Sequence, residues 1–142
     1  MNKKGFTLME LTIVLALLVI VAAILVPTFI LTTERARLRA DIQSAQVIQN
    51  AIELYRIERG EVVVGLNDDN MDTVINRLVY VGYINPRNIA PQTEDAEWHF
   101  EPNFGVMVDI RESGNEVRRA YIALNDAERE FVFGGSSSDN DD

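Results

Sequence analysis

One uncharged apolar run near the start of this chain constrains its folding more than any other feature. From Leu11 to Thr33 there are 23 consecutive residues without a charge. At about 1.5 Å of rise per residue, a helix over this run would be roughly 35 Å long, which is enough to cross the hydrocarbon core of a bilayer. A secretory signal has a shorter apolar core, of about 7–15 residues. The run therefore predicts a membrane-spanning helix.

The residues in front of this run are not those of a plain membrane anchor. Lys3 and Lys4 precede Gly5 and Phe6, and a carboxylate follows at Glu10. A charge in a membrane segment costs about 2–3 kcal/mol near the helix centre and less near the interface. A plain single-pass anchor explains the length of the run and the two lysines, but it does not explain Glu10 at this spacing. We therefore expect Glu10 to have a function that offsets its cost.

The segment Lys4–Leu11 resembles the class III signal of type IV prepilins and pseudopilins. In that family a membrane peptidase cuts after the glycine, the new N-terminal phenylalanine is N-methylated, and the glutamate becomes the fifth residue of the mature chain. These three positions correspond to Gly5, Phe6 and Glu10. The resemblance implies that Glu10 meets the N-terminal amine of a neighbouring subunit during assembly. It covers about residues 1–59 and weakens to general layout beyond them.

The resemblance also implies a fold and a division of the chain. The expected fold class is α+β, with a long N-terminal helix packed on a small antiparallel sheet, as in the type IV pilin fold. Pro27 falls where the family often carries a proline inside this helix. It is interpreted either as a passive kink at the membrane edge or as a site where the helix can loosen in a packed filament. The expected parts are a leader peptide at 1–5, a transmembrane and filament-core helix at 6–33, an amphipathic half of the helix at 34–60, a globular α+β head at 61–133 and a flexible acidic tail at 134–142.

The second half of the long helix has a single apolar face. Apolar residues recur at steps of three and four from Leu38 to Tyr55, while polar residues such as Asp41 and Gln49 cover the other faces. Gly60 is a natural C-cap. The first half, which is apolar all round, is expected in lipid or in a bundle of its own kind, and the second half is expected on the globular head.

The head is predicted to contain one short helix followed by strands. Met71 to Tyr83 has helical spacing, with Asn70 or Asp72 as its cap. A tight turn is expected at residues 113–115. Alternating apolar residues predict strands at 97–101, 105–111 and 117–124, and a further strand at 130–133.

The charge balance limits the classes of partner. The net charge is −9, and removal of two lysines with the leader would make it −11. Such a surface repels phosphate backbones, so nucleic-acid binding along a filament shaft is not expected. Arg35, Arg37 and Arg39 form a basic cluster just outside the membrane segment, where lipid head groups or acidic patches of a neighbouring subunit are the expected partners. The chain has no cysteine, which favours pseudopilins, or pilins that rely on packing or a metal, over disulfide-bounded pilins.

The sequence contains no pattern typical of an enzyme active site. His99 is the only histidine, and its alternation with Trp98 and Phe100 predicts a solvent-facing position in a strand. No cofactor is expected. One alternative is a calcium site, since major pseudopilins of type II secretion hold calcium in a carboxylate-bearing loop. The candidates here are Asp68, Asp69 and Asp72, which are interpreted instead as a solvated turn that caps a helix.

The interpretation is a structural protein, not an enzyme: the major subunit of a type IV pilus-like filament. Its expected partners are further copies of itself in a helical filament, the prepilin peptidase, an inner-membrane assembly platform and, before assembly, membrane lipid. It would lie in the cytoplasmic membrane before assembly, and in a cell-surface pilus or an envelope pseudopilus afterwards. The alternatives are a pseudopilin of a type II secretion or competence system, a minor tip pilin, and a monomeric membrane-anchored domain.

Overall fold

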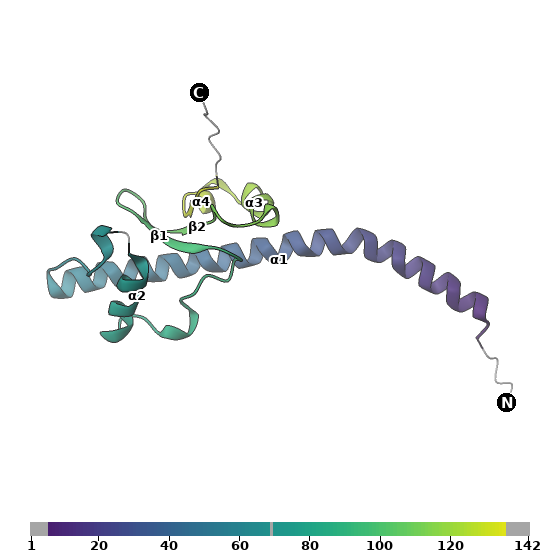
Figure 1. Cartoon of the computed structure of the whole chain (residues 1–142), viewed down its shortest axis with the longest axis horizontal. Helices are drawn as coiled ribbons and strands as arrows, with labels where there is room; N and C mark the ends of the chain where they lie inside the picture. Colours follow the sequence, from purple (N-terminus) through teal and green to yellow (C-terminus); the bar gives the residue numbers. More distant parts are fainter. Residues whose placement is uncertain (1–5, 69, 136–142) are drawn as a thin grey trace, which may run out of the picture.

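A single long helix, α1 (Leu8–Arg59), runs the length of the molecule, and all other elements gather around its C-terminal half (Figure 1). The computed structural model describes residues 6–68 and 70–135. The N-terminal half of α1 projects alone and curves away from the head (Figure 1). After α1 the chain forms η1 (Leu66–Asp68), α2 (Met71–Tyr80), η2 (Pro86–Asn88), β1 (Glu97–Glu101), β2 (Gly105–Asp109), α3 (Asn115–Ile122), α4 (Asp126–Arg129) and β3 (Val132–Phe133).

Local signals set both ends of α1. Thr7 is the N-cap, with extended backbone angles and a side chain that accepts a hydrogen bond from the backbone N–H of Glu10. Gly60 ends the helix in the left-handed conformation at φ 70°, and its N–H donates to the carbonyl of Arg56. The helix continues through Pro27 without a break. The long helix expected from the sequence is therefore confirmed to within two residues at its start.

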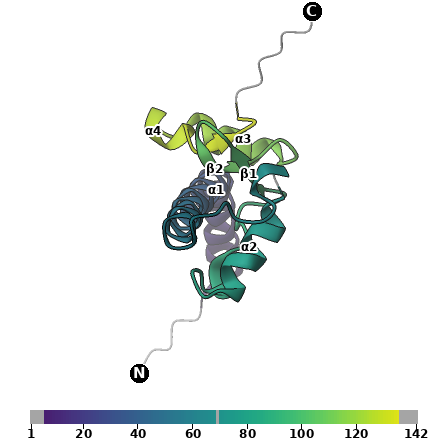
Figure 2. The same cartoon turned by 90° about the vertical axis from the view of Figure 1, so that its left-hand side faces the viewer.

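The hydrophobic core lies along one face of the second half of α1. The residues of the expected stripe at steps of three and four are buried, including Leu38, which has no exposed surface, and Ile48, which is 1% exposed. Val47 and Leu54, which were expected to widen the stripe, are 56% and 45% exposed. Figure 2 shows α1 end-on, with α2 on one side and the sheet, α3 and α4 on another. The α1 face packs against these elements: Val74 and Leu78 of α2 and Val106 and Val108 of β2 complete the same cluster.

The sheet has three strands in the order β1–β2–β3, and it is mixed rather than antiparallel. β1 pairs with β2 in antiparallel fashion, whereas β2 and β3 are parallel, with Val108 opposite Val132. The prediction of an antiparallel sheet is therefore wrong for β3. The reason is the connection between β2 and β3, because it contains α3 and α4. A helical crossover returns the chain to the same end of the sheet and so makes the strands parallel.

The segment expected as a third strand, residues 117–124, is mostly the helix α3. Its buried residues are Val117, Ala120 and Leu124, spaced by three and four. This spacing is that of one helix face, and it was misinterpreted as a strand because Val117 and Tyr121 favour strands locally. Gly114, expected in a tight turn, is the N-cap of α3. The α3 face packs on α1, so tertiary packing decides the conformation.

Two polar residues expected on the solvent face of α1 instead attach the head to the helix. Asp41 has no exposed surface, and its carboxylate accepts hydrogen bonds from the N–H groups of Gln92 and Thr93 at 2.7 and 2.8 Å. The amide oxygen of Gln49 accepts from the N–H of Val106 at 3.1 Å. It reaches this strand because Gly105 has no Cβ, which would lie 2.6 Å from that oxygen.

The aromatic residues of the head are placed partly as expected. Trp98 and Phe100 pack against the core. Phe104, by contrast, is 63% exposed. His99 is not solvent-facing: its side chain is 17% exposed, and its ring lies 4.2 Å from that of Phe133. The short β3 strand brings Phe133 over His99, and this pairing was not evident from the alternation alone.

Candidate processing and assembly site

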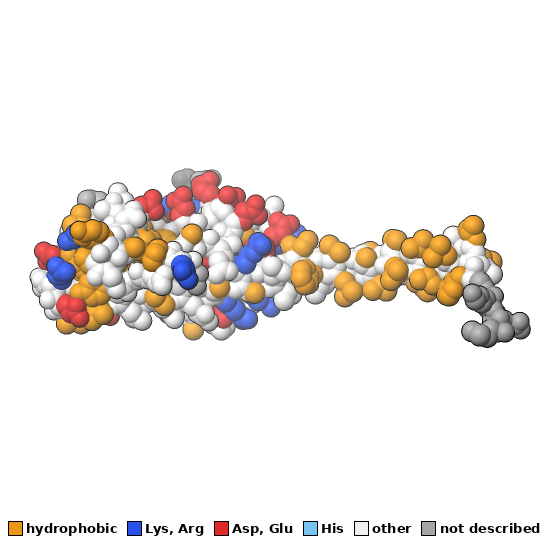
Figure 3. Space-filling view, turned by 90° about the horizontal axis from the view of Figure 1, so that it is seen from below, with side chains coloured by type: hydrophobic (Ala, Val, Ile, Leu, Met, Phe, Trp, Pro, Cys, Tyr) orange, Lys and Arg blue, Asp and Glu red, His pale blue; other side chains and the backbone are white. Residues whose placement is uncertain are grey.

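The projecting half of α1 is the largest exposed apolar surface of the described chain. The exposed large hydrophobic residues from Phe6 to Ile30 have exposed fractions between 43% and 84%. Figure 3 shows hydrophobic side chains over this whole half, with charged side chains beginning where the head begins. The most apolar stretch of the helix is not buried at all within the described chain. Its length and composition are those of a membrane span.

The start of this helix is a capping box formed by Thr7 and Glu10. The Thr7 hydroxyl accepts from the Glu10 N–H at 3.2 Å, while the Glu10 carboxylate accepts from both the N–H and the hydroxyl of Thr7 at 2.9 Å. These bonds satisfy donors at the first turn that have no partner within the helix. Glu10 therefore has a hydrogen-bond partner in its own chain, in addition to any partner that assembly provides.

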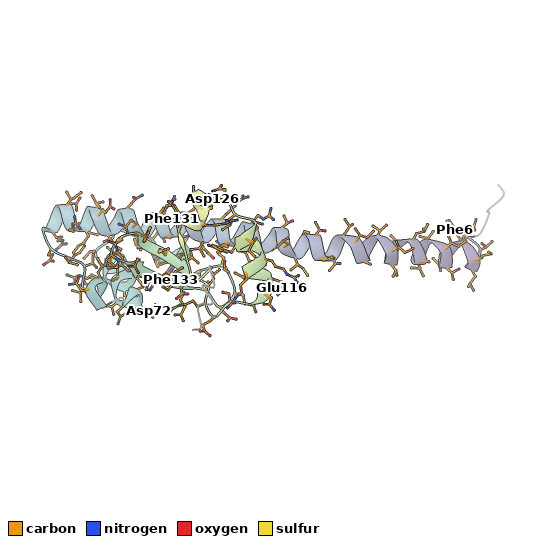
Figure 4. The ribbon with its side chains drawn as sticks, turned by 90° about the horizontal axis from the view of Figure 1, so that it is seen from above. Phe6, Asp72, Glu116, Asp126, Phe131 and Phe133 are labelled. Carbon is orange, nitrogen blue, oxygen red and sulfur yellow. The ribbon has the colours of Figure 1, made fainter. Side chains whose placement is uncertain are left out.

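Phe6 lies at the free end of the projecting helix, far from the head (Figure 4). Its side chain is 84% exposed. Gly5, the expected cleavage residue, lies outside the described residues. Cleavage after it would place the new amine one residue before the N-cap Thr7 and four residues before Glu10. Phe6, the expected first residue of the mature chain, is thus at the tip of the projecting helix, away from the described residues of the head.

Pro27 lies at the far end of the exposed half of α1, close to where the head begins. Because proline has no N–H, the helix lacks one hydrogen bond there. The hydroxyl of Thr28 donates to the carbonyl of Ile24 at 3.3 Å, and those of Thr32 and Thr33 make similar bonds one turn further on. The structure keeps this region helical. Loosening of the helix at Pro27 therefore remains a prediction about the assembled state.

The three arginines of the basic cluster have different surroundings, and two of them have partners within the chain. Arg37 pairs with Glu34 at 2.8 Å, one turn earlier on the same helix. Arg39 forms a two-bond contact with Glu128 of α4, at 2.8 and 3.4 Å. Arg35 is half-buried beside the same glutamate. The cluster therefore contributes to attaching α4 to α1, and contacts with lipid or a neighbouring subunit stay a prediction.

The charge of Glu128 is stabilised from two sides. The backbone N–H of Asn125 donates to its carboxylate at 3.0 Å, and Arg39 donates to both oxygens. These bonds hold the pKa of Glu128 below its ordinary value of 4.5. The contact joins residues 89 positions apart in the chain, so it closes the C-terminal part of the head onto the helix that enters the membrane.

The calcium alternative gains no geometric support. Asp72 is an exposed residue in the first turn of α2 and points out of the head (Figure 4). Asp69 and the side chain of Asp68 lie outside what the structure describes. Among the described residues, no three His, Asp or Glu side chains are grouped so that they could hold a metal ion. Asn70 caps α2 by accepting from the N–H of Thr73, one of the two caps expected from the sequence.

Two contacts in the structure were not predicted from the sequence. One of them, between Thr7 and Glu10, has a recognisable sequence pattern, and the other, made by Asp41, has none. Thr7-Leu8-Met9-Glu10 is the S/T-x-x-E pattern of a capping box just before an apolar run, so the Thr7–Glu10 contact was recognisable. Asp41 gave no such signal. It follows a buried leucine by three residues, but a carboxylate at a helical position is usually solvated, and its backbone partners are about 50 residues away.

Comparison with known proteins supports the interpretation of the N-terminal segment. Residues 1–26 match the family model described as the prokaryotic N-terminal methylation motif. A curated relative, the prepilin peptidase-dependent protein A of Clostridium perfringens (strain 13 / Type A), is 38% identical over 58 residues. The match covers 40% of this chain and 41% of that protein, so the chain spans about two fifths of the relative's length. No solved structure matches the chain.

These matches and the geometry agree on the same segment. The methylation motif ends at residue 26, inside the exposed half of α1 and one residue before Pro27. The chain therefore carries a class III prepilin signal joined to a helix that can span a membrane. Together with the mixed sheet and the short helices of the head, this gives a pilin-like α+β fold.

Proposed function

We propose that the chain is a structural subunit, the major one, of a type IV pilus-like filament. The observation that carries the proposal is the methylation motif directly in front of a 52-residue helix whose first half is apolar and exposed on all sides. Such a surface requires lipid or other helices around it. The subunit waits in the cytoplasmic membrane and is then extracted by an assembly platform into a bundle of its own copies, which is as apolar as the lipid it leaves.

Processing is the first step of this proposal and is directly measurable. A prepilin peptidase cuts after Gly5, and the mature chain begins at N-methylated Phe6. The name of the relative, a prepilin peptidase-dependent protein, supports this partner. Intact-mass measurement of the chain from cells that contain the peptidase should give a protein beginning at methylated Phe6. Gly5→Leu should leave the precursor uncut in the membrane, and a wild-type chain still beginning at Met1 would contradict the proposal.

Glu10 sets the height at which a subunit enters the filament. No cation lies between Leu11 and Thr33, so the nearest positive group after processing is the amine of Phe6. In an apolar bundle a carboxylate without a partner is strongly unfavourable. A subunit that docks with its Glu10 beside the amine of a neighbour satisfies both charges, whereas a subunit at another height satisfies neither. The Thr7 cap provides hydrogen bonds to the same carboxylate until that partner arrives.

Substitutions at two positions separate the amine pairing from helix capping. Glu10→Ala should leave insertion and head folding unchanged but strongly reduce the number of filaments, and Glu10→Asp should restore them only in part because its reach is shorter. Thr7→Val is the matched control, because it removes the capping hydroxyl and keeps Glu10. Electron microscopy of filaments would measure the result. Equal losses in Thr7→Val and Glu10→Ala would assign the effect to capping, and normal filaments in Glu10→Ala would reject the register mechanism.

The assembled location distinguishes the alternatives to a major pilus subunit. Immunogold labelling along the whole shaft supports the major subunit, whereas labelling confined to the tip identifies a minor one. Filaments that stay within the envelope identify a pseudopilus of a secretion or competence system. A chain that remains monomeric in the membrane with Gly5 uncut is an anchored domain, and that result contradicts the filament proposal.

A further inference from the structure

An open groove lies where the head overhangs the projecting half of α1. Its walls are Pro27, Thr28, Ile30 and Leu31 of α1 on one side and Glu116 and Arg119 of α3 on the other, and its volume is about 380 Å³. Figure 4 shows Glu116 at the end of the head that is nearest the exposed helix. The α1 wall is apolar, apart from the hydroxyl of Thr28, which donates to the backbone of its own helix. The groove thus combines an apolar wall with a charged lip.

The position of this groove along α1 places it at the outer surface of the membrane. A hydrocarbon core of about 30 Å needs about 20 residues of helix, and counting from Leu8 these residues end near Pro27. The next turn, up to Leu31, then lies at the boundary between acyl chains and head groups. The apolar wall of the groove continues the exposed surface of α1 without interruption. A ligand that fills the groove in the membrane-anchored chain must therefore fit both the acyl-chain region and the head-group region of the membrane.

The charged lip carries one group of each sign. Glu116 and Arg119 are exposed and three residues apart on α3, so they lie on the same side of the helix. Neither side chain has a hydrogen-bond or ion-pair partner in the part of the chain that the structure describes. Other arginines nearby are already engaged: Arg118 donates to the carbonyl of Arg111, and Arg37 pairs with Glu34. Glu116 and Arg119 are thus available to an external ligand.

We propose that this groove binds a membrane phospholipid with a primary-ammonium head group, of the phosphatidylethanolamine type. Arg119 binds the phosphate, Glu116 accepts hydrogen bonds from the ammonium, and an acyl chain lies along the apolar wall from Pro27 to Leu31. The ligand would fix the height and rotation of the head on the membrane before extraction. This inference rests on the membrane-anchored state of the proposed function and adds to it the lipid class and the residues that select it.

Native mass spectrometry of the full chain tests the lipid contact. The chain is inserted into vesicles that contain equal amounts of phosphatidylethanolamine and phosphatidylcholine, and the lipids retained after mild detergent release are counted. The wild-type chain should retain phosphatidylethanolamine preferentially. Arg119→Gln should lower the retained amount about five-fold, which is the expected effect of one cation at a lipid surface. Glu116→Gln should keep a bound lipid but lose the preference between the two head groups.

Two further variants make the test specific to the groove. Arg87→Gln is the matched control, because it removes the same charge from an exposed position on η2 and should leave retention unchanged. Leu31→Trp fills the groove without changing charge and should lower retention as Arg119→Gln does. Equal losses in Arg87→Gln and Arg119→Gln would show general charge attraction and overturn the inference. So would equal retention of both lipids by the wild-type chain.

Membrane extraction with carbonate separates this inference from the proposed function. If the chain stays in the membrane but shows no head-group preference, the lipid groove is wrong and the membrane-anchored subunit stands. If the wild-type chain is released by carbonate, the proposed anchoring itself fails. A third outcome is that Arg119→Gln retains lipid normally but forms fewer filaments. The groove would then be occupied by a second copy of the chain, and the lipid assignment would be overturned.

Discussion

The two halves of α1 are one continuous helix in opposite environments. The first half exposes nearly every apolar side chain, such as Leu18 at 58%, whereas the second half buries a full face, with Leu38 at 0%. The backbone is the same, so the difference comes from what each half packs against. The second half obtains its partners from its own chain, through α2, β2 and α3. The first half has none among the described residues and must obtain them from lipid or from other copies.

The carboxylates of the two halves show the same contrast. Glu10 is satisfied locally, by the N–H and hydroxyl of a residue three positions earlier. Asp41 is satisfied by two backbone N–H groups of a loop about 50 residues later in the chain. Glu10 is consequently free to change partner without unfolding anything, whereas Asp41 cannot be released unless the loop at residues 92–93 detaches. Of these two carboxylates, only Glu10 can exchange its partner while the head stays folded.

A matched pair of leucine substitutions tests the contrast most strongly. Leu38→Ala should destabilise the head by about 3–4 kcal/mol, because it removes a fully buried side chain and leaves a cavity. Leu18→Ala should leave head unfolding unchanged, because its side chain touches no part of the head. Denaturant unfolding of the full chain in detergent, followed by the fluorescence of Trp98, measures both. Trp98 reports on the head because its indole N–H donates to the carbonyl of Ile89.

Assembly should show the reverse order for the same pair. Leu18→Ala removes contact surface from the filament core and should lower filament yield, although the head is intact. If Leu18→Ala destabilised the head as much as Leu38→Ala, the two halves would not be independent.

Removal of the buried Asp41 carboxylate should have the next largest effect on the stability of the head. Asp41→Ala leaves the N–H groups of Gln92 and Thr93 without their acceptor, and Thr93 is buried, so we expect a loss of about 2–3 kcal/mol. Asp41→Asn should lose less, since its amide oxygen can still accept one of the two bonds. The Trp98 signal measures these losses too.

Asp72→Ala is the control for Asp41→Ala, because this aspartate is exposed in the first turn of α2. Its effect should be much smaller. A loss in Asp72→Ala equal to that in Asp41→Ala would mean that burial of the carboxylate does not determine its contribution.

The sequence predicted those parts of the fold that depend on local pattern. The apolar run, the stripe from Leu38 to Tyr55 and the cap at Gly60 are all local, and the structure has each of them. The processing signal is equally local, which is why residues 1–26 also match a family model. Contacts between distant segments were not predictable in this way, because nothing near Asp41 or Arg39 in the sequence indicates residues 92–93 or Glu128.

The α3 helix shows how tertiary packing overrides local preference. Val117 and Tyr121 favour a strand, and the turn-like residues before them completed the expectation of a hairpin. The decisive fact is that Val117, Ala120 and Leu124 are all buried while α3 packs on α1. That requires a helix, and the helix in turn makes β3 parallel to β2 and forms the lip of the groove beside Pro27.

The contact between Arg39 and Glu128 should give the smallest effect, and it depends on pH. The pKa of Glu128 is lower in the folded chain than its ordinary value of 4.5, so the folded chain binds this proton less tightly than the unfolded chain does. The hydrogen bonds from Asn125 and from Arg39 to this carboxylate therefore stabilise the head fully above about pH 4.5, and the stabilisation is lost as the pH falls through the lowered pKa.

Glu128→Gln measures this contribution when its unfolding is compared with that of the wild-type chain across the acid range. At neutral pH the wild-type chain should be more stable than Glu128→Gln, by less than the effect of Asp41→Ala. This difference in stability should shrink as the pH falls, because a protonated Glu128 resembles glutamine. High salt should also reduce it, because the pair is partly exposed. Arg39→Gln should show the same pH trend with Glu128 intact. A difference that stays constant from neutral to acid pH would show that the charge of Glu128 contributes nothing. The Arg39–Glu128 ion pair would then not be what holds α4 on α1.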